Sequence, residues 1–293
     1  MKRLLILLFS PILTLGQCVL GDCENGYGVF KALNGEIYSG QWIDGQEDGL
    51  GYLQISEEGY YFGEFRKNNK EGIGTYYNSS DWYIGEIREN QKEGYGYLIF
   101  GDDYSYHVGQ FAEDLKHGMG LRSDVTNGRW YFGEWINGEP QDKKSKKGKK
   151  NLLQGCLVGK CKNGQGLYVS DRVLLGKWVK GKIKGTGIMA GGDVAVGEFK
   201  DDKLNGKCFY WWQSTGEMAL GTFSNGNLIE GNTIVRKSDG EIFIGETKDG
   251  GINHGYGISI IYNKIKSVYE YHIGTWEEGK VIEVESYIAN KLN

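Results

Sequence analysis

One short pattern recurs along almost the whole chain and constrains its fold more than any other feature. The first complete copy is Tyr38-Ser-Gly40-Gln-Trp42, and Gly49-Leu-Gly51 begins seven positions after the tryptophan. Units of this kind begin 21 to 25 residues apart within each half of the chain, at Gly26, Gly49, Gly72, Gly94 and Gly118, then at Gly164, Gly185, Gly206, Gly231 and Gly255. Self-similarity at such a period indicates a repeat protein, in which each unit buries its apolar surface against its neighbours.

The central glycine of the pattern lies between two large side chains on one strand face. Period-2 alternation places Tyr38, Gly40 and Trp42 on that face. A glycine there weakens a strand, so its presence in every copy predicts close approach by a neighbouring aromatic ring or backbone. The predicted structural core of the repeats comprises Tyr38, Gly40, Trp42, Gly63, Phe65, Gly85, Gly109, Gly133, Trp135, Gly176, Trp178, Gly197, Gly221, Gly245, Gly274 and Trp276.

Each unit is predicted to be one β-hairpin. The interval from the second aromatic residue to the next Gly-x-Gly is almost fixed at seven residues. The interval from Gly-x-Gly to the following Tyr-x-Gly varies from ten to seventeen residues, so it must hold a protruding turn. Asn34-Gly35, Asn127-Gly128 and Asp239-Gly240 lie in it and are strong hairpin signals. Short connections favour antiparallel pairing. The expected fold is all-β, an elongated single-layer antiparallel β-meander of stacked hairpins.

The two faces of this meander are expected to differ. The aromatic face is predicted to be the packed side. The positions between glycine and the second aromatic are predicted to line the other face, and they are Gln41, Glu64, Glu86, Gln110, Glu134, Lys177, Glu198 and Glu246. The sequence leaves open whether the two halves form one continuous sheet.

This pattern resembles the MORN repeat. The family consensus of Tyr-x-Gly-x-Trp/Phe, a glycine-containing connection and Gly-x-Gly is met by about 240 of the 293 residues. The resemblance implies a single-layer β-meander that acts as a scaffold, a tether or a dimerising element, with lipid headgroup association in some members. It therefore favours a non-enzymatic protein without a cofactor.

The chain is internally duplicated. The block that contains Cys18 and Cys23 reappears with Cys156 and Cys161 at the same spacing. We expect local disulfides within each pair, because an exported compartment favours oxidation. A shared zinc ion and lipid attachment at Cys18 are the alternatives. Cys208 replaces a glycine of the repeat and is predicted to be a small packed residue.

The N-terminus has the features of a secretory signal. A basic start at Lys2 and Arg3 precedes an apolar stretch from Leu4 to Leu15 and a small residue at Gly16. We assign residues 1–16 to a signal peptide and expect export to the periplasm, cell surface or medium. The apolar stretch is too short for the roughly 20 residues of a membrane span, so the mature chain is expected to have none. A buried N-terminal strand is the alternative.

A lysine-rich segment separates the halves. We predict a first repeat array at residues 17–140, a linker at 141–154 and a second, more degenerate array at 155–293. The alternative is that the linker contacts an anionic surface through Lys143, Lys144, Lys146, Lys147, Lys149 and Lys150. Near the C-terminus we expect a long turn from Ser259 to Tyr271 and a polar cap from Glu283 onward.

No motif for catalysis, metal binding or nucleic-acid binding was found. The four histidines occupy repeat positions, with His107 and His272 at the tyrosine position. The Gly-x-Gly pairs are not followed by helices, so they are not predicted to bind phosphate. The formal net charge of −4 provides no basic footprint for nucleic acid.

The function predicted from the sequence is a non-enzymatic exported scaffold that binds an unidentified protein partner. Dimerisation of two copies through sheet edges is an additional prediction. The alternative function is an envelope-surface binder of anionic lipid or glycan, which uses the lysine-rich linker and exposed aromatic residues.

Overall fold

The structure is a computed structural model that describes residues 16–56, 59–102, 104–126, 128–141, 145–147 and 154–290. All of its regular elements are β-strands, and they form two sheets. The first sheet contains β1 (Gly16–Gly21), β2 (Gly26–Ala32), β3 (Ile37–Ile43), β4 (Gln46–Gln54), β5 (Tyr60–Arg66), β6 (Asn69–Tyr77), β7 (Asp81–Arg88), β8 (Gln91–Phe100), β9 (Tyr106–Ala112), β10 (Leu115–Asp124), β11 (Arg129–Ile136), β12 (Glu139–Pro140) and β13 (Ser145–Lys147). The second contains β14 (Gly155–Gly159), β15 (Gly164–Val169), β16 (Val173–Val179), β17 (Lys182–Gly191), β18 (Asp193–Lys200), β19 (Lys203–Trp212), β20 (Glu217–Ser224), β21 (Asn227–Leu228), β22 (Gly231–Arg236), β23 (Ile242–Lys248), β24 (Ile252–Asn263), β25 (Val268–Glu277) and β26 (Lys280–Asn290).

The strands follow one another in chain order and pair antiparallel throughout each sheet. The predicted all-β meander of consecutive hairpins is therefore confirmed. Only β13 and β21 leave this order, because they pair with β11 and β20. No helix that could cross a membrane is found in the described residues.

The fixed connections between hairpins are two-residue turns in which both residues adopt positive φ. Lys67 and Asn68 have φ of 49° and 66°, and Glu89 and Asn90 have 48° and 69°. These values are typical of the type I′ turn, whose twist matches that of the flanking strands. The Asn68 carboxamide oxygen also accepts the backbone N–H of Glu47 at 2.9 Å, so each turn is tied to the preceding repeat.

A tyrosine ring lies over two glycines in each well-formed repeat of the first sheet. A Cβ atom on Gly40 would meet the Tyr38 hydroxyl at 2.5 Å, and one on Gly51 of the next strand would meet the same ring at 2.6 Å. The hydroxyl donates to the Gln41 carbonyl at 2.9 Å. Glycine is therefore required because the ring occupies the space of a side chain. The Trp42 indole N–H donates to the Gly28 carbonyl of the preceding strand at 3.2 Å.

The polar positions predicted to line an open face have a structural role in the first sheet. The pairing register of β3 with β4 shifts between Gly40 and Trp42. The shift leaves one backbone N–H of β4 without a backbone hydrogen-bond partner in β3. The Gln41 Oε1 atom accepts that N–H from Leu50 at 2.7 Å. The next three repeats contain the equivalent hydrogen bond. The backbone N–H donors are Ile73, Tyr95 and Met119, and the side-chain oxygen acceptors are Glu64, Glu86 and Gln110, respectively. In contrast, Glu134, Lys177, Glu198 and Glu246 are exposed.

The expectation that only the aromatic face is packed was wrong, because both faces of each sheet are buried. The residue that follows the first aromatic position points to the opposite face, and in most repeats it is a fully buried apolar residue: Phe62, Ile84, Val108, Leu175, Val196, Leu220 and Ile244. Phe62 of the first sheet meets Phe209 of the second, with ring centroids 6.0 Å apart and nearly perpendicular planes. This second apolar row forms the core between the sheets.

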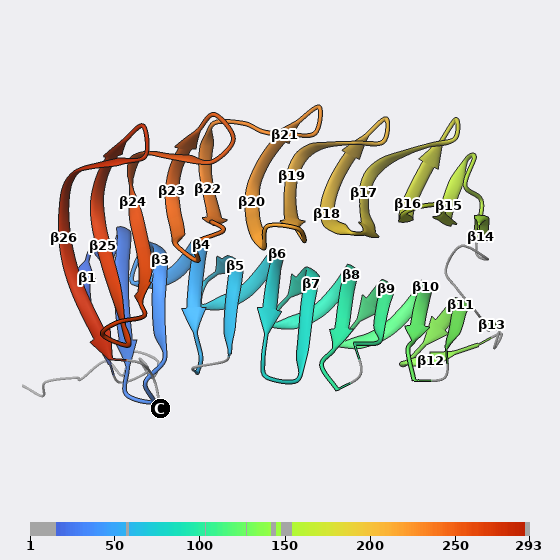
Figure 1. The fold of residues 1–293 in the computed structure, drawn as a ribbon, viewed down its shortest axis with the longest axis horizontal. Coiled ribbons are helices and arrows are strands. Elements are labelled where there is room, and N and C mark those ends of the chain that lie inside the picture. The colour runs from blue at the N-terminus through green and yellow to red at the C-terminus, as the bar shows by residue number, and fades with distance from the viewer. Residues whose placement is uncertain are drawn as a thin grey trace, which may run out of the picture.

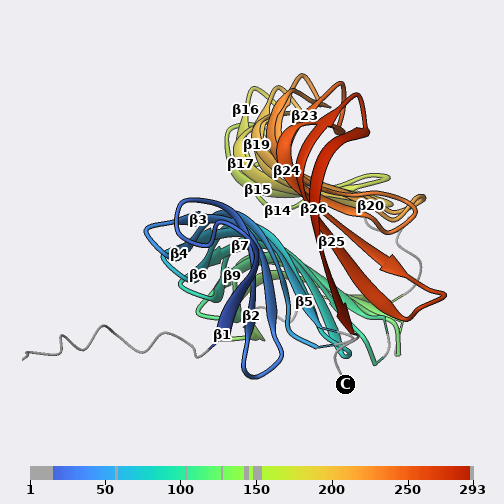
Figure 2. The same ribbon diagram turned by 90° about the vertical axis from the view of Figure 1, so that its left-hand side faces the viewer.

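The second sheet folds back along the first, so the halves form two sheets that face each other (Figure 1). β14 lies against β11, β17 against β8, and β26 against β1, so the order of the second sheet runs opposite to that of the first. Each sheet is curved when seen along the long axis of the molecule (Figure 2). Two further cores lie one in each sheet, an aromatic core in the first and a largely aliphatic core in the second.

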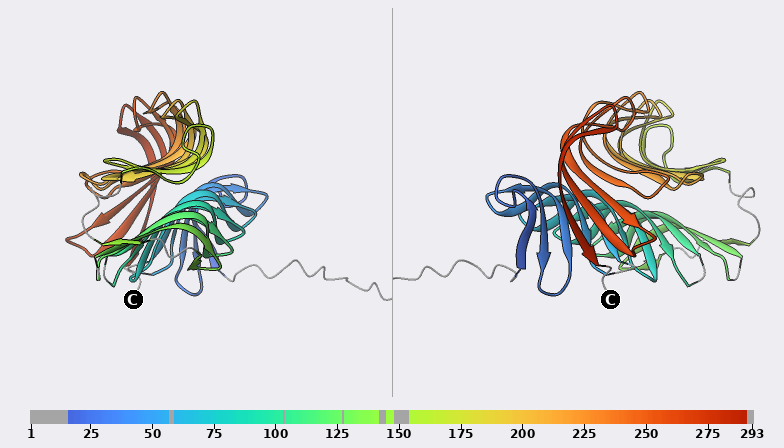
Figure 3. Two further views of the ribbon diagram at one scale, coloured as in Figure 1. Left: turned by 90° about the vertical axis from the view of Figure 1, so that its right-hand side faces the viewer. Right: turned by 60° about the vertical axis from the view of Figure 1, so that its left-hand side comes forward.

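The C-terminal region also differs from the expectation. The long turn predicted from Ser259 to Tyr271 is largely strand, because β24 and β25 pair from Gly255↔Trp276 to Asn263↔Val268. The polar cap predicted from Glu283 onward lies mostly within β26, which pairs along its length with β25. These long strands extend beyond the others and reach across the end of the first sheet (Figures 2 and 3).

Candidate functional site

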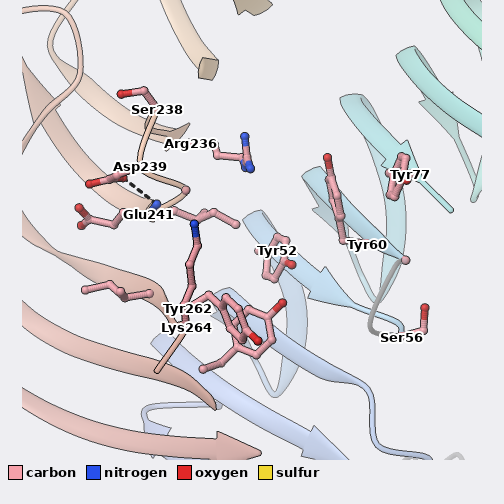
Figure 4. Close-up of a pocket in the computed structure, with 15 residues that line it drawn as sticks. Tyr52, Ser56, Tyr60, Tyr77, Arg236, Ser238, Asp239, Glu241, Tyr262 and Lys264 are labelled. Atoms are coloured by element: carbon pink, nitrogen blue, oxygen red, sulfur yellow. Dashed lines mark hydrogen bonds between the residues drawn. The ribbon is translucent and has the colours of Figure 1, made fainter. Parts of the chain in front are cut away.

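A pocket of about 530 Å³ opens between the two sheets. The first sheet contributes the end of β4, the start of β5 and the end of β6, and the second contributes the β22–β23 turn and the extended hairpin of β24 and β25. Residues nearly 200 positions apart are thereby brought together (Figure 4). The fold-back of the second sheet is what creates this pocket.

The pocket is lined by tyrosines from both sheets. Tyr60 stacks on Tyr77 with ring centroids 5.5 Å apart and planes inclined by 30°, and Tyr52 lies 5.9 Å from Tyr60. On the second sheet, Tyr262 and Tyr269 lie 5.0 Å apart. Aromatic side chains of both sheets therefore line the pocket (Figure 4).

Charged side chains surround these rings, but several are already engaged. The Arg236 guanidinium donates to the Gly216 carbonyl at 3.0 Å. Glu241 pairs with Lys237 at 2.9 Å and accepts a hydrogen bond from Ser259 at 2.8 Å. Asp239 and Lys264 are exposed and have more capacity for a ligand.

Two of the pocket tyrosines, Tyr52 and Tyr60, are held in the neutral form by burial. Burial raises the pKa of Tyr60 to about 12, although nearby Arg236 opposes this shift. Burial also raises the pKa of Tyr52 well above 10. A phenol with such a pKa is a poor general base or nucleophile near pH 7.

A second exposed feature is the outer edge of the second sheet. β26 pairs with β25 on one side. Val281, Ile282 and Ile288 are 56%, 60% and 57% exposed, which is unusual for apolar residues of a strand. Glu283 and Glu285 are exposed on the same strand. An edge of this kind offers unpaired backbone groups to another chain.

The core positions predicted from the sequence are buried. All the predicted glycines belong to the buried class, and Tyr38, Trp42, Phe65, Trp135, Trp178 and Trp276 are at most 7% exposed. They are distributed along both sheets and do not converge on one site. His107 takes the tyrosine position and is fully buried against Phe111 and Trp135.

The cysteines lie as disulfides at the start of each sheet. The Sγ atoms of Cys18 and Cys23 are 2.03 Å apart, and those of Cys156 and Cys161 are 2.07 Å apart. Cys208 is a buried thiol, and burial raises its pKa to about 12. Within the described residues, no group of three or more His, Cys, Asp or Glu side chains is arranged to hold a metal ion.

Two sequence-based assignments fall on residues outside this description. Residues 1–15 of the predicted signal peptide and Lys143, Lys144, Lys149 and Lys150 of the linker lie outside the described residues, as does Asn127. Lys146 and Lys147 belong to β13, which pairs with β11, but the positions of their side chains are not described.

The sequence analysis missed the pocket tyrosines. Tyr52, Tyr60 and Tyr77 lie outside the Tyr-x-Gly-x-Trp positions, and Tyr262 and Tyr269 were placed in a long turn. The only signal in the sequence was the excess of tyrosine near the ends of these strands. That signal does not reveal which residues of the two halves meet.

The regular hairpins, the glycine positions beneath tyrosine rings and the two meandering sheets define a β-hairpin repeat protein. The MORN repeat family model matches residues 38–56, 61–81, 83–103, 107–129, 131–141 and 196–216. The chain therefore contains MORN repeats, and five of the six matched segments lie in the first sheet.

Part of the chain is similar to two curated relatives. Alsin from Rattus norvegicus and Alsin from Homo sapiens are each 31% identical to it over 126 residues. The matched region covers 40% of this chain and 8% of each Alsin chain. The chain therefore spans only a small part of the length of these relatives.

Proposed function

We propose that the protein is a non-enzymatic, exported scaffold that binds a protein partner by strand addition to β26. The observation that carries this proposal is the 11-residue edge strand that pairs on one side and exposes Val281, Ile282 and Ile288. Strand addition uses main-chain hydrogen bonds for affinity and side chains for specificity. A long apolar edge is otherwise a site of unwanted association, which natural sheets usually block.

The partner segment is expected to be extended, apolar and basic. Its apolar side chains would cover Ile282 and Ile288, and its basic side chains would lie near Glu283 and Glu285. The two glutamates disfavour a β26–β26 pair that places them opposite each other. We therefore favour a heterologous partner over a second copy of this chain.

Export is supported by the two disulfides and by the N-terminal sequence. Disulfides persist in oxidising compartments and are rare in the cytosol. The lack of a catalytic role is supported by the matches to a repeat family and by the raised pKa of Tyr52 and Tyr60. The alternative that the lysine-rich linker binds an anionic surface stays a prediction, because its side chains lie outside the described residues.

The proposal is tested by affinity capture of a tagged chain from extracts of the cells that make it. Ile282→Lys and Ile288→Lys each place a charge on the β26 edge. Leu33→Lys is the matched control, because Leu33 is 75% exposed and lies in a turn of the first sheet. We expect one stoichiometric protein partner to be retained by wild type and the control and lost from both β26 variants.

Retention of every captured protein by the β26 variants would refute strand addition. Size-exclusion chromatography with light scattering adds an independent test. A wild-type dimer that becomes a monomer on Ile282→Lys would show that the edge binds a second copy instead.

A further inference from the structure

We propose that the pocket between the two sheets binds the sugar rings of a glycan. This goes beyond the proposed function, because the pocket is lined by residues of β4 to β6 and β22 to β25 and by none of β26. The two surfaces are therefore available to two different ligands.

The aromatic walls suit the faces of a pyranose ring. A pyranose presents C–H groups on its faces, and the electron-rich face of an aromatic ring attracts such weakly positive hydrogens. Tyr60 and Tyr77 stack on each other in one wall of the pocket, with their ring planes inclined by 30°. Tyr262 and Tyr269 supply aromatic surface from the opposite sheet.

The polar groups suit the hydroxyls at the edge of a sugar. Tyr52 lines the pocket, is only 6% exposed, and its hydroxyl has no hydrogen-bond partner within the described part of the chain. A phenol hydroxyl that lines a pocket can donate a hydrogen bond to a ligand and accept one from it. A sugar hydroxyl both donates and accepts, so it fits this phenol.

The charges at the rim distinguish a glycan from a purely anionic ligand. Lys264 donates hydrogen bonds, whereas Asp239 accepts them and carries the opposite charge. A phosphate-like group would be attracted by Lys264 but repelled by Asp239. Hydroxyl groups can pair with both residues, because a hydroxyl can donate and accept hydrogen bonds.

The size of the pocket is also compatible with this ligand. Its volume of about 530 Å³ lies within the range of roughly 300–1,000 Å³ that is usual for small-molecule sites. It therefore has room for a mono- or disaccharide, and a longer glycan would extend into solvent. Its lining combines five tyrosines with charged and polar side chains, and such combinations are found in small-molecule sites.

The test uses the full mature chain with its disulfides intact. A printed glycan array identifies binders, and isothermal titration calorimetry then measures affinity for soluble N,N′-diacetylchitobiose, cellobiose, maltose and digalacturonic acid. We expect at least one glycan to bind. Tyr77→Ala is expected to weaken its binding at least tenfold, whereas Tyr77→Phe, which keeps the ring, is expected to change it less than threefold. Lys264→Ala is expected to weaken binding severalfold.

Tyr104→Asn is the matched control, because Tyr104 is 78% exposed, lies outside the pocket and has a positive φ that asparagine tolerates. It is expected to bind as wild type does. Thermal melting of each variant separates loss of binding from loss of folding. The proposal is overturned if wild type binds no glycan, or if the folded Tyr77→Ala variant binds as tightly as wild type. Binding of inositol phosphates in preference to every sugar would also overturn it.

This result is independent of partner capture. Failure of glycan binding leaves the effect of Ile282→Lys unchanged, and loss of the protein partner leaves glycan titrations unchanged. The two proposals can therefore fail separately.

Discussion

The Lys207 ammonium group of the second sheet lies 2.7 Å from the Glu64 carboxylate of the first. The other oxygen of the same carboxylate accepts the backbone N–H of Ile73 at 3.0 Å. One side chain therefore completes its own repeat and also joins the two sheets. These two roles can be separated by mutation.

Glu64→Ala is expected to lower the free energy of unfolding by about 1–3 kcal/mol, because the half-buried N–H of Ile73 loses its acceptor. Glu64→Gln keeps a carbonyl oxygen for that N–H and loses only the ion pair with Lys207. It is expected to cost at most about 1 kcal/mol, as is Lys207→Ala. Urea denaturation measures all three. Equal losses for Glu64→Ala and Glu64→Gln would show that the bond to Ile73 contributes little.

Gly74→Ala is expected to destabilise the protein by about 1–3 kcal/mol, because the new Cβ would lie 2.6 Å from the Tyr61 hydroxyl. On a Tyr61→Leu background the same substitution should cost less, since the phenol is absent. A double-mutant cycle by chemical denaturation measures this coupling. Strictly additive effects would contradict the role of the ring in excluding a side chain.

His107→Tyr is expected to stabilise the protein by about 0.5–2 kcal/mol. Both ring nitrogens of His107 are buried without a hydrogen-bond partner within the described residues. At the equivalent position, the Tyr83 hydroxyl donates to the Glu86 carbonyl at 2.8 Å. Differential scanning calorimetry near pH 7.5 measures the change, and a lower melting temperature for the variant would refute this expectation.

The same substitution should alter the dependence of stability on pH. Burial holds the pKa of His107 well below 6.5, and nearby Lys116 and Arg122 act in the same direction. Below about pH 6.5 the unfolded chain binds a proton that the folded chain does not, so stability falls as pH decreases. The contribution of His107 to the free energy of unfolding decreases by up to about 1.4 kcal/mol per pH unit as the pH is lowered. This decrease ends when the pH reaches the pKa of His107 in the folded chain. Melting from pH 7.5 to 5 should be less pH-dependent for His107→Tyr, and identical profiles would exclude this contribution.

Phe209→Ala is expected to cost about 3–5 kcal/mol, because its fully buried ring packs against Phe62 across the sheet interface. We expect the two sheets to unfold in one transition that shifts as a whole. Calorimetry measures this, with the exposed Leu33→Ala as a near-neutral control. Two separate transitions, of which only one shifts, would show that the sheets are energetically independent.

Much of each hairpin could be predicted from the sequence because its determinants are local. The alternation of Tyr38, Gly40 and Trp42 fixed one strand face, and Asn34-Gly35 marked a turn. The role of Gln41 was missed, because an alternating pattern does not reveal where the register shifts. The division of the chain at the lysine-rich segment, and the signal peptide, stay predictions.

The candidate site could not be predicted in this way. Tyr60 and Tyr262 belong to hairpins about 200 residues apart, and no local pattern relates them. The apolar row at Phe62, Ile84 and Val108 did carry a usable signal, because apolar residues on both faces of a strand indicate that both faces are buried. That signal predicts a covering layer but not its identity.

The sequence by itself determined that this protein is a meander of β-hairpin repeats, because strand alternation, tight turns and the space taken by a tyrosine ring all act within one or two repeats. Only the tertiary structure decided that the second sheet folds back on the first, since that depends on which buried rows meet. The contacts of Phe62 with Phe209 and of Glu64 with Lys207 align the sheets in opposite order. The tyrosine pocket follows from this alignment, because its walls come from hairpins that are distant in the chain and adjacent only after the two sheets pack.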